Sequence, residues 1–594
     1  MDIPNLKGCR LLASCRGSEA NGPGATTLDK EVDAVMNATT VQSHEEGGWP
    51  SIDWASATHT VQRLQQRIFR ASQQGHWRQV RSLQKLLLRS DANLVLSVRQ
   101  VTQVNDGRAT PGVDGRVATT AKERWRLLID LRQARSHRPQ PVRRVYIPKA
   151  NGKLRALGIA TIEDRVRQHV VKTALEPACE AHFEASSYGF RPGRSVHDAI
   201  AACFNWLKGR STARWVLDAD IRGAFDHISH AYILHRLGNF PARHQIQAWL
   251  KAGYLEHGRF FSTTEGTPQG AICSPLVANV ALDGLAELLM RQFPHPQTRT
   301  RAYFGYVRYA DDLVVTSPDK GRLEAAIPVI RQWLAERGLE LNDEKTRIVH
   351  IDDGFNFLGF HLRRYKGTLL IKPQKEKVLA KLAEIRAWLK AHAGAKQEEV
   401  IAHLNQMLRG WSLYYRHVVS SQVYTYVDHR LFRMLWTWAR RRHPRKPAKW
   451  IKAKYFHTIG TRKWVFAVKT KDRRGQPITR SLAETRRAIV RHVLVVGTYS
   501  PLDPALRNYW HKRARWRAQL RYDENPVKRL LAARQNWRCS VCNASLLNEE
   551  PVDLHHLQAV ARGGTDELHN LDLRHEACHY NAHEHSRDYS KRTA

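Results

Sequence analysis

Asp311 and Asp312 are adjacent carboxylates in the stretch FGYVRYADDLVV (residues 304–315), between two apolar, β-branched runs that are typical of short strands. Asp218 and Asp220 end a further predicted strand, RWVLDAD. Carboxylates at strand ends of one sheet can converge, and they then repel one another unless divalent cations lie between them. Mg²⁺ suits such a place, because it binds one or two protein carboxylates together with substrate phosphates. Two such ions about 4 Å apart form a site for in-line nucleotidyl transfer. Taken alone, the pair fits a tight turn equally well.

A second group of potential ligands lies near the C-terminus. Cys539 and Cys542 form a CxxC motif, and His575 and Cys578 form an HxxC motif. This spacing is typical of a tetrahedral structural zinc site, which can hold together a segment too small for a large hydrophobic core. His575 also precedes His579 by four residues and could serve another metal on a helix face, although we favour zinc.

The charge of the chain points to a polyanionic partner. Lys and Arg number 95 against 55 Asp and Glu, a formal net charge of +40. A nucleic acid accounts for this excess. A membrane surface fits worse, because no run of about 18 apolar residues is present. Five of the eight cysteines are scattered and the N-terminus lacks a secretory pattern, so we expect a reducing, cytoplasmic compartment.

The elements that must position these residues fall into segments of different composition. Short β-rich runs alternate with helical patterns before residue 365, which is typical of an α+β unit. Residues 430–480 contain 17 Lys or Arg and a single acid, interleaved with tryptophans, a mixture that favours phosphate contacts and base stacking. A helical bundle with solvated basic faces is the alternative. We expect a flexible leader at 1–55, the α+β unit at 56–365, a mostly helical region at 366–490, a basic linker at 491–530 and a compact tail at 531–594.

Several motifs carry a resemblance to one family. DIRGAFD, GTPQGAICSPLVANV, YADD and GLELNDEKT follow one another as the polymerase motifs of reverse transcriptases do. YIPKANGKLRALGIATIEDRVRQ, SSYGFRPGRSVHDAI, FNFLGF and the GW…YY stretch LNQMLRGWSLYYRHV resemble the group II intron-encoded subclass, over most of residues 90–590. The resemblance implies an α+β multi-domain protein with a right-hand-like polymerase (fingers and palm) at 56–365, and a helical thumb or maturase X domain at 366–490. The basic linker would bind DNA.

The resemblance also implies roles for individual residues of the polymerase. Asp220, Asp311 and Asp312 would hold two Mg²⁺ ions, with the carbonyl of Ile221 as a further ligand. Lys345 would protonate the leaving pyrophosphate. The residues expected around the incoming nucleotide are Lys149 and Arg155 on the triphosphate, Phe225 against a 2′-hydroxyl, and Gln269 and Gly270 in the loop beneath.

Beyond its cysteines, the tail resembles the HNH nucleases, which implies a small zinc-containing ββα-metal module. In that family His555 and His579 would ligate one divalent metal, His556 would be the general base for water, and Asn570 would orient that base. A neutral imidazole suits proton abstraction near neutral pH. The alternative is a catalytically silent zinc module that grips DNA.

Together these motifs predict a reverse transcriptase, maturase and DNA endonuclease that supports intron mobility by target-primed reverse transcription. Its partners would be group II intron RNA, target DNA and dNTPs, with no membrane. We expect a bacterial, cytoplasmic protein that is nucleoid-associated when it targets DNA, and an organellar origin stays open. The alternative is an RNA-binding splicing factor with an unused polymerase and a non-catalytic zinc tail. A retron or diversity-generating enzyme would not account for the X-like region and the tail together.

Overall fold

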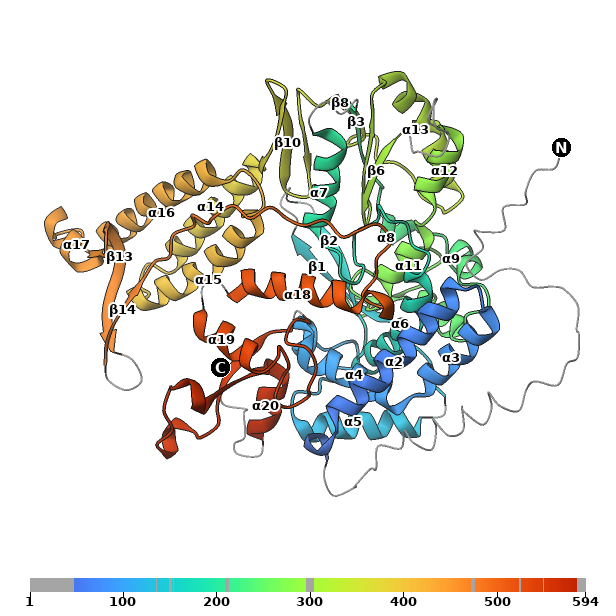
Figure 1. The fold of residues 1–594 in the computed structure, drawn as a ribbon, viewed down its shortest axis with the longest axis horizontal. Coiled ribbons are helices and arrows are strands. Elements are labelled where there is room, and N and C mark those ends of the chain that lie inside the picture. Colours follow the sequence, from blue (N-terminus) through green and yellow to red (C-terminus); the bar gives the residue numbers. More distant parts are fainter. Residues whose placement is uncertain are drawn as a thin grey trace, which may run out of the picture.

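The computed structural model (Figure 1) describes residues 48–134, 136–148, 152, 154–208, 213–294, 304–471, 476–522, 525–548 and 550–584. Most of the predicted leader therefore lies outside the described residues. From residue 48 to 55 the prediction of a flexible leader is wrong. Trp49 and Trp54 are 1% and 4% exposed, because they pack edge to face in a hydrophobic core. No helix in the described ranges combines the length and the apolar character needed to cross a membrane.

A layer of helices forms the N-terminal part of the described chain. A break at Gly75 separates the first two long helices, and Asp53 caps the first of them by accepting from the amides of Ala55 and Ser56. The elements are η1 (Trp49–Ser51), α2 (Trp54–Gln73), α3 (Trp77–Arg89), α4 (Asp91–Arg99), η2 (Gln100–Val104), η3 (Asp106–Ala109), α5 (Ala121–Gln133) and α6 (Ile162–Glu180).

An antiparallel four-stranded sheet carries the predicted carboxylates. Its strand order is β6-β7-β3-β8, from β3 (Trp215–Asp220), β6 (Gly305–Tyr309), β7 (Asp312–Ser317) and β8 (Arg347–His350). Val216 and Val314 pack in one core with helix α7 (Val196–Leu207), and Leu217 and Val315 pack in another with α13 (Lys320–Ala335). Burial on both faces explains the apolar character of these strands.

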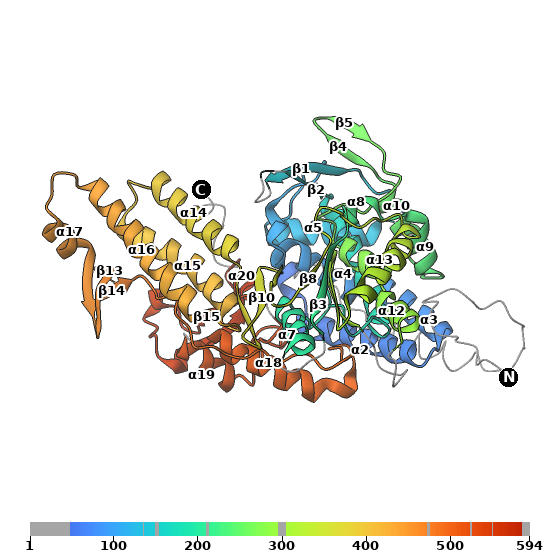
Figure 2. The ribbon, with the colours of Figure 1, turned by 90° about the horizontal axis from the view of Figure 1, so that it is seen from above.

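A second sheet projects beside the first and belongs to the fingers. Its order is β2-β1-β4-β5, with β1 and β4 parallel. Figure 2 shows β4 and β5 extending away from the rest of the molecule. The strands are β1 (Val142–Pro148), β2 (Leu154–Ile159), β4 (Tyr254–Glu256) and β5 (Arg259–Phe261), and the helices of this region and the palm are α8 (Ala224–His227), α9 (His230–Leu237), α10 (Arg243–Leu250), α11 (Ser274–Ala281) and α12 (Leu285–Gln292).

The region expected to be mostly helical is so only in part. Helices α14 (Lys375–Ala391), α15 (Gln397–Tyr415), α16 (Ser421–Arg442) and α17 (Ala448–Tyr455) confirm the first part. The prediction is wrong beyond them, where β12 (Phe456–Ile459), β13 (Arg462–Lys471) and β14 (Pro477–Ser481) form an antiparallel sheet. The run KWVFAVKT is rich in aromatic and β-branched residues, which favour a strand.

A small sheet joins this helical region to the palm. It consists of β9 (Phe355–Phe357), β10 (Phe360–Tyr365) and β11 (Thr368–Pro373). The hydroxyls of Tyr414 and Tyr415 donate to the carbonyls of Leu358 and Gly359, at 2.9 and 3.1 Å. The two tyrosines of the GW…YY stretch are therefore packing residues at this joint.

The C-terminal segment returns across the molecule from the region of α14–α17 to the N-terminal helices (Figure 1). Residues 482–503 carry no helix or strand, and η4 (Pro504–Leu506) and α18 (Arg507–Tyr522) follow. The tail then contains α19 (Pro526–Arg534), β15 (Val552–His556), η5 (Val560–Arg562), η6 (Leu568–Asn570), β16 (Leu571–His575) and α20 (Glu576–Glu584). Its buried residues share one hydrophobic core with Trp49, Trp54 and helix α4.

Candidate active site and metal centre

The structure brings the three predicted carboxylates to one end of two neighbouring strands. Asp220 lies opposite Asp312 in the register of β3 and β7, and Asp311 stands in the turn between β6 and β7. The amide of Ile221 donates to the Asp311 carbonyl at 3.2 Å. Ala310 has a φ of 56° in this turn. A left-handed conformation costs a non-glycine residue about 1–2 kcal/mol, and tight hairpin turns require it.

Burial and mutual repulsion disfavour the charged forms of these carboxylates. Burial, together with the negative charges of Asp311 and Asp220, raises the pKa of Asp312 to about 7. The pKa of Asp311 is also raised, by burial and by Asp220, while Arg155 and Lys345 oppose the shift. Carboxylates that lack sufficient positive charge fit a site for divalent cations.

Lys345 supplies part of the missing charge. Its Nζ atom lies 2.8 Å from Oδ2 of Asp220, and Asn342 Nδ2 donates to the same oxygen at 3.2 Å. The hydrogen bond to Asp220 raises the pKa of Lys345, which therefore reaches the site as an ammonium ion. Asp218, two residues before Asp220 on β3, pairs with Arg347 at 3.3 Å, and its charge also contributes to the raised pKa of Asp312.

The loop with Gln269 and Gly270 lies between the fingers and helix α8. The Gly158 amide donates to the Gln269 carbonyl at 2.6 Å, and the Thr267 amide donates to the Phe225 carbonyl at 2.6 Å. Gly270 has a φ of +105°, and a Cβ atom there would lie 3.0 Å from the carbonyl oxygen of Gly158. This loop therefore links the strand of Arg155 to Phe225. Lys149 lies outside the described residues.

Phe190 is a residue of this site that sequence reasoning missed. It has a φ of 58° and is 53% exposed, and its ring centroid lies 6.3 Å from that of Phe225 and 6.4 Å from that of Tyr309. The preceding Gly189 permits this, since a Cβ atom there would lie 2.5 Å from the amide nitrogen of Ala310. The Gly-Phe pair in SSYGFRPGRS was the available signal.

The Cys/His cluster consists of Cys539, Cys542, His575 and Cys578. All four are buried, and one ligand atom from each lies within 4.8 Å of the others. Cys542 Sγ lies 3.3 Å from His575 Nδ1. Hydrogen bonds with Cys542 and Cys578 hold the pKa of Cys539 well below that of a free thiol. Three thiols and one imidazole in a buried group fit Zn²⁺. His575 thus lies with the cysteines, as we expected for a zinc ligand, and not in a group with His579.

The other histidines of the tail lie on a strand, strand, helix unit made by β15, β16 and α20. His579 Nδ1 lies 3.2 Å from Asp553 Oδ2, and the rings of His555 and His579 are 5.2 Å apart. His556 Nε2 lies 2.7 Å from Asp566 Oδ1, a partner that sequence reasoning missed. Within the described ranges, only the Cys/His cluster gathers three or more such ligands within 4.8 Å. In the carboxylate group of Asp220, Asp311 and Asp312, and in the group of these histidines, the potential ligand atoms are therefore spaced more widely than in the Cys/His cluster.

Asn570 does not contact His556 through any hydrogen bond that the described residues show. Its Nδ2 donates to the carbonyls of Gln558 and Thr565, at 3.0 and 2.8 Å, and its Oδ1 accepts from the Gln558 amide at 2.8 Å. Asn570 therefore fixes the loop that follows His556, and any effect on that imidazole is indirect.

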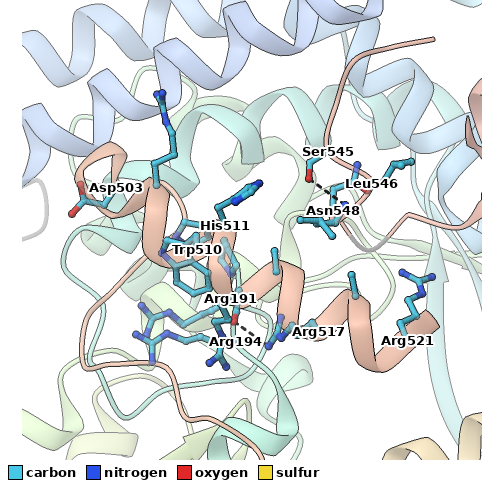
Figure 3. A pocket seen from close by; sticks show the side chains of 18 of the residues that line it. Arg191, Arg194, Asp503, Trp510, His511, Arg517, Arg521, Ser545, Leu546 and Asn548 are labelled. Carbon is cyan, nitrogen blue, oxygen red and sulfur yellow. Dashed lines mark hydrogen bonds between the residues drawn. The ribbon is translucent and has the colours of Figure 1, made fainter. Parts of the chain in front are cut away.

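A basic cleft of about 910 Å³ opens between the palm, α18 and the tail (Figure 3). Arg191 and Arg194 come from the palm, Arg517 and Arg521 from α18, and residues 545–548 of the tail close one side. Trp510 lies among the arginines in Figure 3, and the only carboxylate in the described lining is Asp503. The cleft suits a nucleic-acid strand by charge.

Comparison with known proteins agrees with this geometry. Residues 147–362 match the model for reverse transcriptase (RNA-dependent DNA polymerase), residues 49–131 match the N-terminal domain of reverse transcriptase, and residues 379–456 match the group II intron maturase-specific domain.

Three similar proteins extend the comparison. Protein YkfC of Escherichia coli (strain K12) is 34% identical over 320 residues, which cover 48% of this chain and 84% of that protein. Group II intron-encoded protein LtrA of Lactococcus lactis subsp. cremoris is 31% identical over 373 residues, which cover 51% of this chain and 60% of LtrA. An uncharacterized 91 kDa protein in a cob intron of Schizosaccharomyces pombe is 27% identical over 355 residues, 47% of this chain and 44% of that protein. The chain belongs to the family of group II intron-encoded reverse transcriptases and maturases.

Proposed function

We propose that the protein copies RNA into DNA at the site formed by Asp220, Asp311 and Asp312. The observation that carries the proposal is the register of β3 and β7, which sets Asp220 opposite Asp312 beside the strained turn of Asp311. These carboxylates would hold two Mg²⁺ ions, with the carbonyl of Ile221 nearby. The ions, when bound, supply the positive charge that activates the primer hydroxyl and stabilises pyrophosphate.

The protein's own residues have separate tasks in this reaction. Arg155, whose charge lowers the pKa of Asp311, would contact the triphosphate of the incoming nucleotide. Phe225 faces Phe190 at the nucleotide side and would exclude a 2′-hydroxyl. Lys345, held as an ammonium ion by Asp220, would give a proton to the leaving pyrophosphate. We propose Lys149, Gln269 and Gly270 as the remaining residues of the nucleotide site.

Primer extension on an RNA template tests the polymerase. The wild type should incorporate dNTPs in Mg²⁺, and Asp311→Ala should not, because the carboxylate cannot be replaced by water in the site. Glu324→Gln is the matched control, since Glu324 is an exposed carboxylate on α13 that pairs only with Lys320 in the described contacts. Equal extension by wild type and Asp311→Ala would contradict the assignment.

We further propose that the helical region binds the intron RNA and promotes its splicing. A groove of about 460 Å³ between α14 and α16 supports this, because its described lining contains no carboxylate. Its basic residues are Arg386, Lys390, Arg430, Arg433 and Arg441. Charge of one sign in a groove attracts a phosphate backbone. A splicing assay at low Mg²⁺ tests this role, and the absence of rescue by the protein would contradict it.

For the tail, we propose a zinc-bound module that nicks target DNA and supports target-primed mobility, with α18 contributing to DNA binding. His556, next to Asp566, would act as the base for water, and His555 and His579 would hold a divalent metal. The alternative is a zinc module that only binds DNA, which the open arrangement of these histidines favours. Nicking that disappears in His556→Ala separates the two.

A further inference from the structure

The tail is not an independent unit in this structure. Trp537, Leu546 and Val552 of the tail are buried in the same core as Trp54 and Val98 of the polymerase. Cys539, Cys542 and Cys578 belong to this core as well. In Figure 1, α20 lies beside α4, although more than 400 residues separate them in the chain. The metal centre therefore lies next to the boundary between the two units.

Arg99, the last residue of α4, reaches across this boundary. Its side chain is 6% exposed, and its Nη2 atom lies 3.3 Å from Cys578 Sγ and 3.1 Å from Glu550 Oε2. Its guanidinium also lies 5.2 Å from the ring centroid of Trp54. One turn further on, Gln103 Nε2 donates to Asn581 Oδ1 at 2.6 Å. These contacts join the polymerase to the HxxC half of the metal site.

The charge of a loaded centre explains a buried arginine at this place. Three thiolates, a neutral imidazole and a divalent ion carry a net charge of −1, and a buried charge requires a partner. The guanidinium supplies one positive charge and donates to a ligand sulfur. Arg99, which also pairs with Glu550 of the tail, thus offsets part of the negative charge of the centre from outside the tail.

We propose that Arg99 and the metal-bearing Cys/His centre form a joint that docks the tail onto the polymerase, so that metal binding and docking are coupled. The inference rests on the zinc site proposed above. Arg99 is a positioning residue here, since it acts through the ligand Cys578. When the metal leaves, Cys578 is no longer held in the place from which it contacts Arg99, so the tail should loosen from α4.

Docking also completes the basic cleft. His575 Nε2 lies 3.2 Å from the carbonyl oxygen of Ser545, and residues 545–548 close one side of the cleft. A ligand of the metal therefore positions the cleft wall that the tail contributes. Loss of the joint should therefore displace residues 545–548 from the cleft as well as release the tail from α4.

The test compares full-length wild type, Arg99→Met, Arg99→Lys and the control Arg89→Met. Arg89 is an exposed arginine at the end of α3, on the helix before Arg99. The readouts are zinc per chain, the rate of zinc transfer to a chromogenic chelator, and limited proteolysis followed by mass spectrometry of the tail peptides. None of these readouts depends on catalysis.

We expect about one zinc per chain in the wild type, and faster release by about 10- to 100-fold in Arg99→Met, the range for loss of a residue that supports a metal ligand. The tail of this variant should be cleaved while the polymerase fragment stays intact. Arg99→Lys should release zinc at an intermediate rate, because it keeps the charge but not the planar fork. Arg89→Met should match the wild type.

A second measurement uses the wild type alone and does not depend on the folding of any variant. Chelation should expose the tail to protease, and added zinc should restore its protection. The joint would be overturned, and the metal site kept, if zinc-loaded Arg99→Met released zinc at the wild-type rate and its tail resisted protease as in the wild type. The same conclusion would follow if the wild-type tail resisted protease equally well without metal. A wild type without zinc would overturn the metal site together with the joint.

Discussion

Asp198 ties the palm to the segment that returns from the thumb, and its replacement by asparagine should release that segment. Its side chain is fully buried on α7. Oδ1 accepts from His492 Nε2 at 3.0 Å, from the Val495 amide at 3.0 Å and from Arg513 Nη2 at 2.7 Å. Oδ2 accepts from the amide and the hydroxyl of Ser195, at 2.9 and 2.6 Å.

Asparagine cannot reproduce this set of bonds. If its oxygen takes the place of Oδ1, its NH₂ group faces the Ser195 amide, and two donors then meet. Arg513 also stays buried without a counter-charge on Asp198, a change that costs about 3–5 kcal/mol when a buried pair is broken. The lower figure corresponds to about a 100-fold rise in the open population.

Hydrogen exchange at the Val495 amide measures this opening directly. We expect about 100-fold faster exchange in Asp198→Asn, spreading to α18, and unchanged exchange in the control Glu324→Gln. The hydrogen bonds and charges of His492 and Arg513 hold the pKa of Asp198 below its usual value, despite burial. The stabilisation is therefore present at neutral pH and is lost as the pH falls below about 4. Exchange within threefold of the wild type at pH 7 would refute this account.

Three further predictions concern the polymerase and the tail. Phe225→Val should raise the use of ribonucleotides relative to dNTPs by about 10- to 100-fold in kcat/KM, because the pocket gains room for a 2′-hydroxyl. Phe260→Val, on an exposed strand of the fingers, is its control, and an unchanged ratio would contradict the role of Phe225. Gly266→Ala should abolish primer extension, because the added Cβ atom would lie 2.3 Å from the Asp226 carbonyl oxygen. Gly258 has the same φ of +78° but open space around it, so the control Gly258→Ala should retain activity. His556→Ala should lose nicking of target DNA while the exposed His569→Ala retains it, and nicking that survives in both would remove the proposed base.

The carboxylate site and the Cys/His cluster could be predicted from the sequence because their residues lie in short motifs with a characteristic spacing. Short apolar, β-branched runs indicated β3 and the hairpin of β6 and β7, and the carboxylates at their ends could then converge at one edge of the sheet. The CxxC and HxxC spacing likewise indicated a four-residue cluster, which lies together in the structure.

The contacts that sequence did not predict are long-range or depend on backbone conformation. Arg99 at the end of a helix resembles any surface arginine, and its partners Glu550 and Cys578 lie more than 400 residues away. Trp49 follows a Gly-rich segment that indicated a leader, although the polymerase core buries it. The left-handed φ of Phe190 accompanies close packing of Gly189 on the turn of Ala310, a long-range contact that the Gly-Phe pair in the sequence does not specify by itself.

The central claim is that Asp220, Asp311 and Asp312 act as one site for RNA-templated DNA synthesis. A single-turnover measurement of one dNTP addition to an annealed RNA–DNA primer, in Mg²⁺, tests it most directly when wild type, Asp312→Asn and Glu324→Gln are compared. The account predicts a rate about 1,000-fold lower for Asp312→Asn, the scale of several kcal/mol that metal-ion catalysis contributes, with Glu324→Gln unchanged. Equal rates for wild type and Asp312→Asn would contradict it.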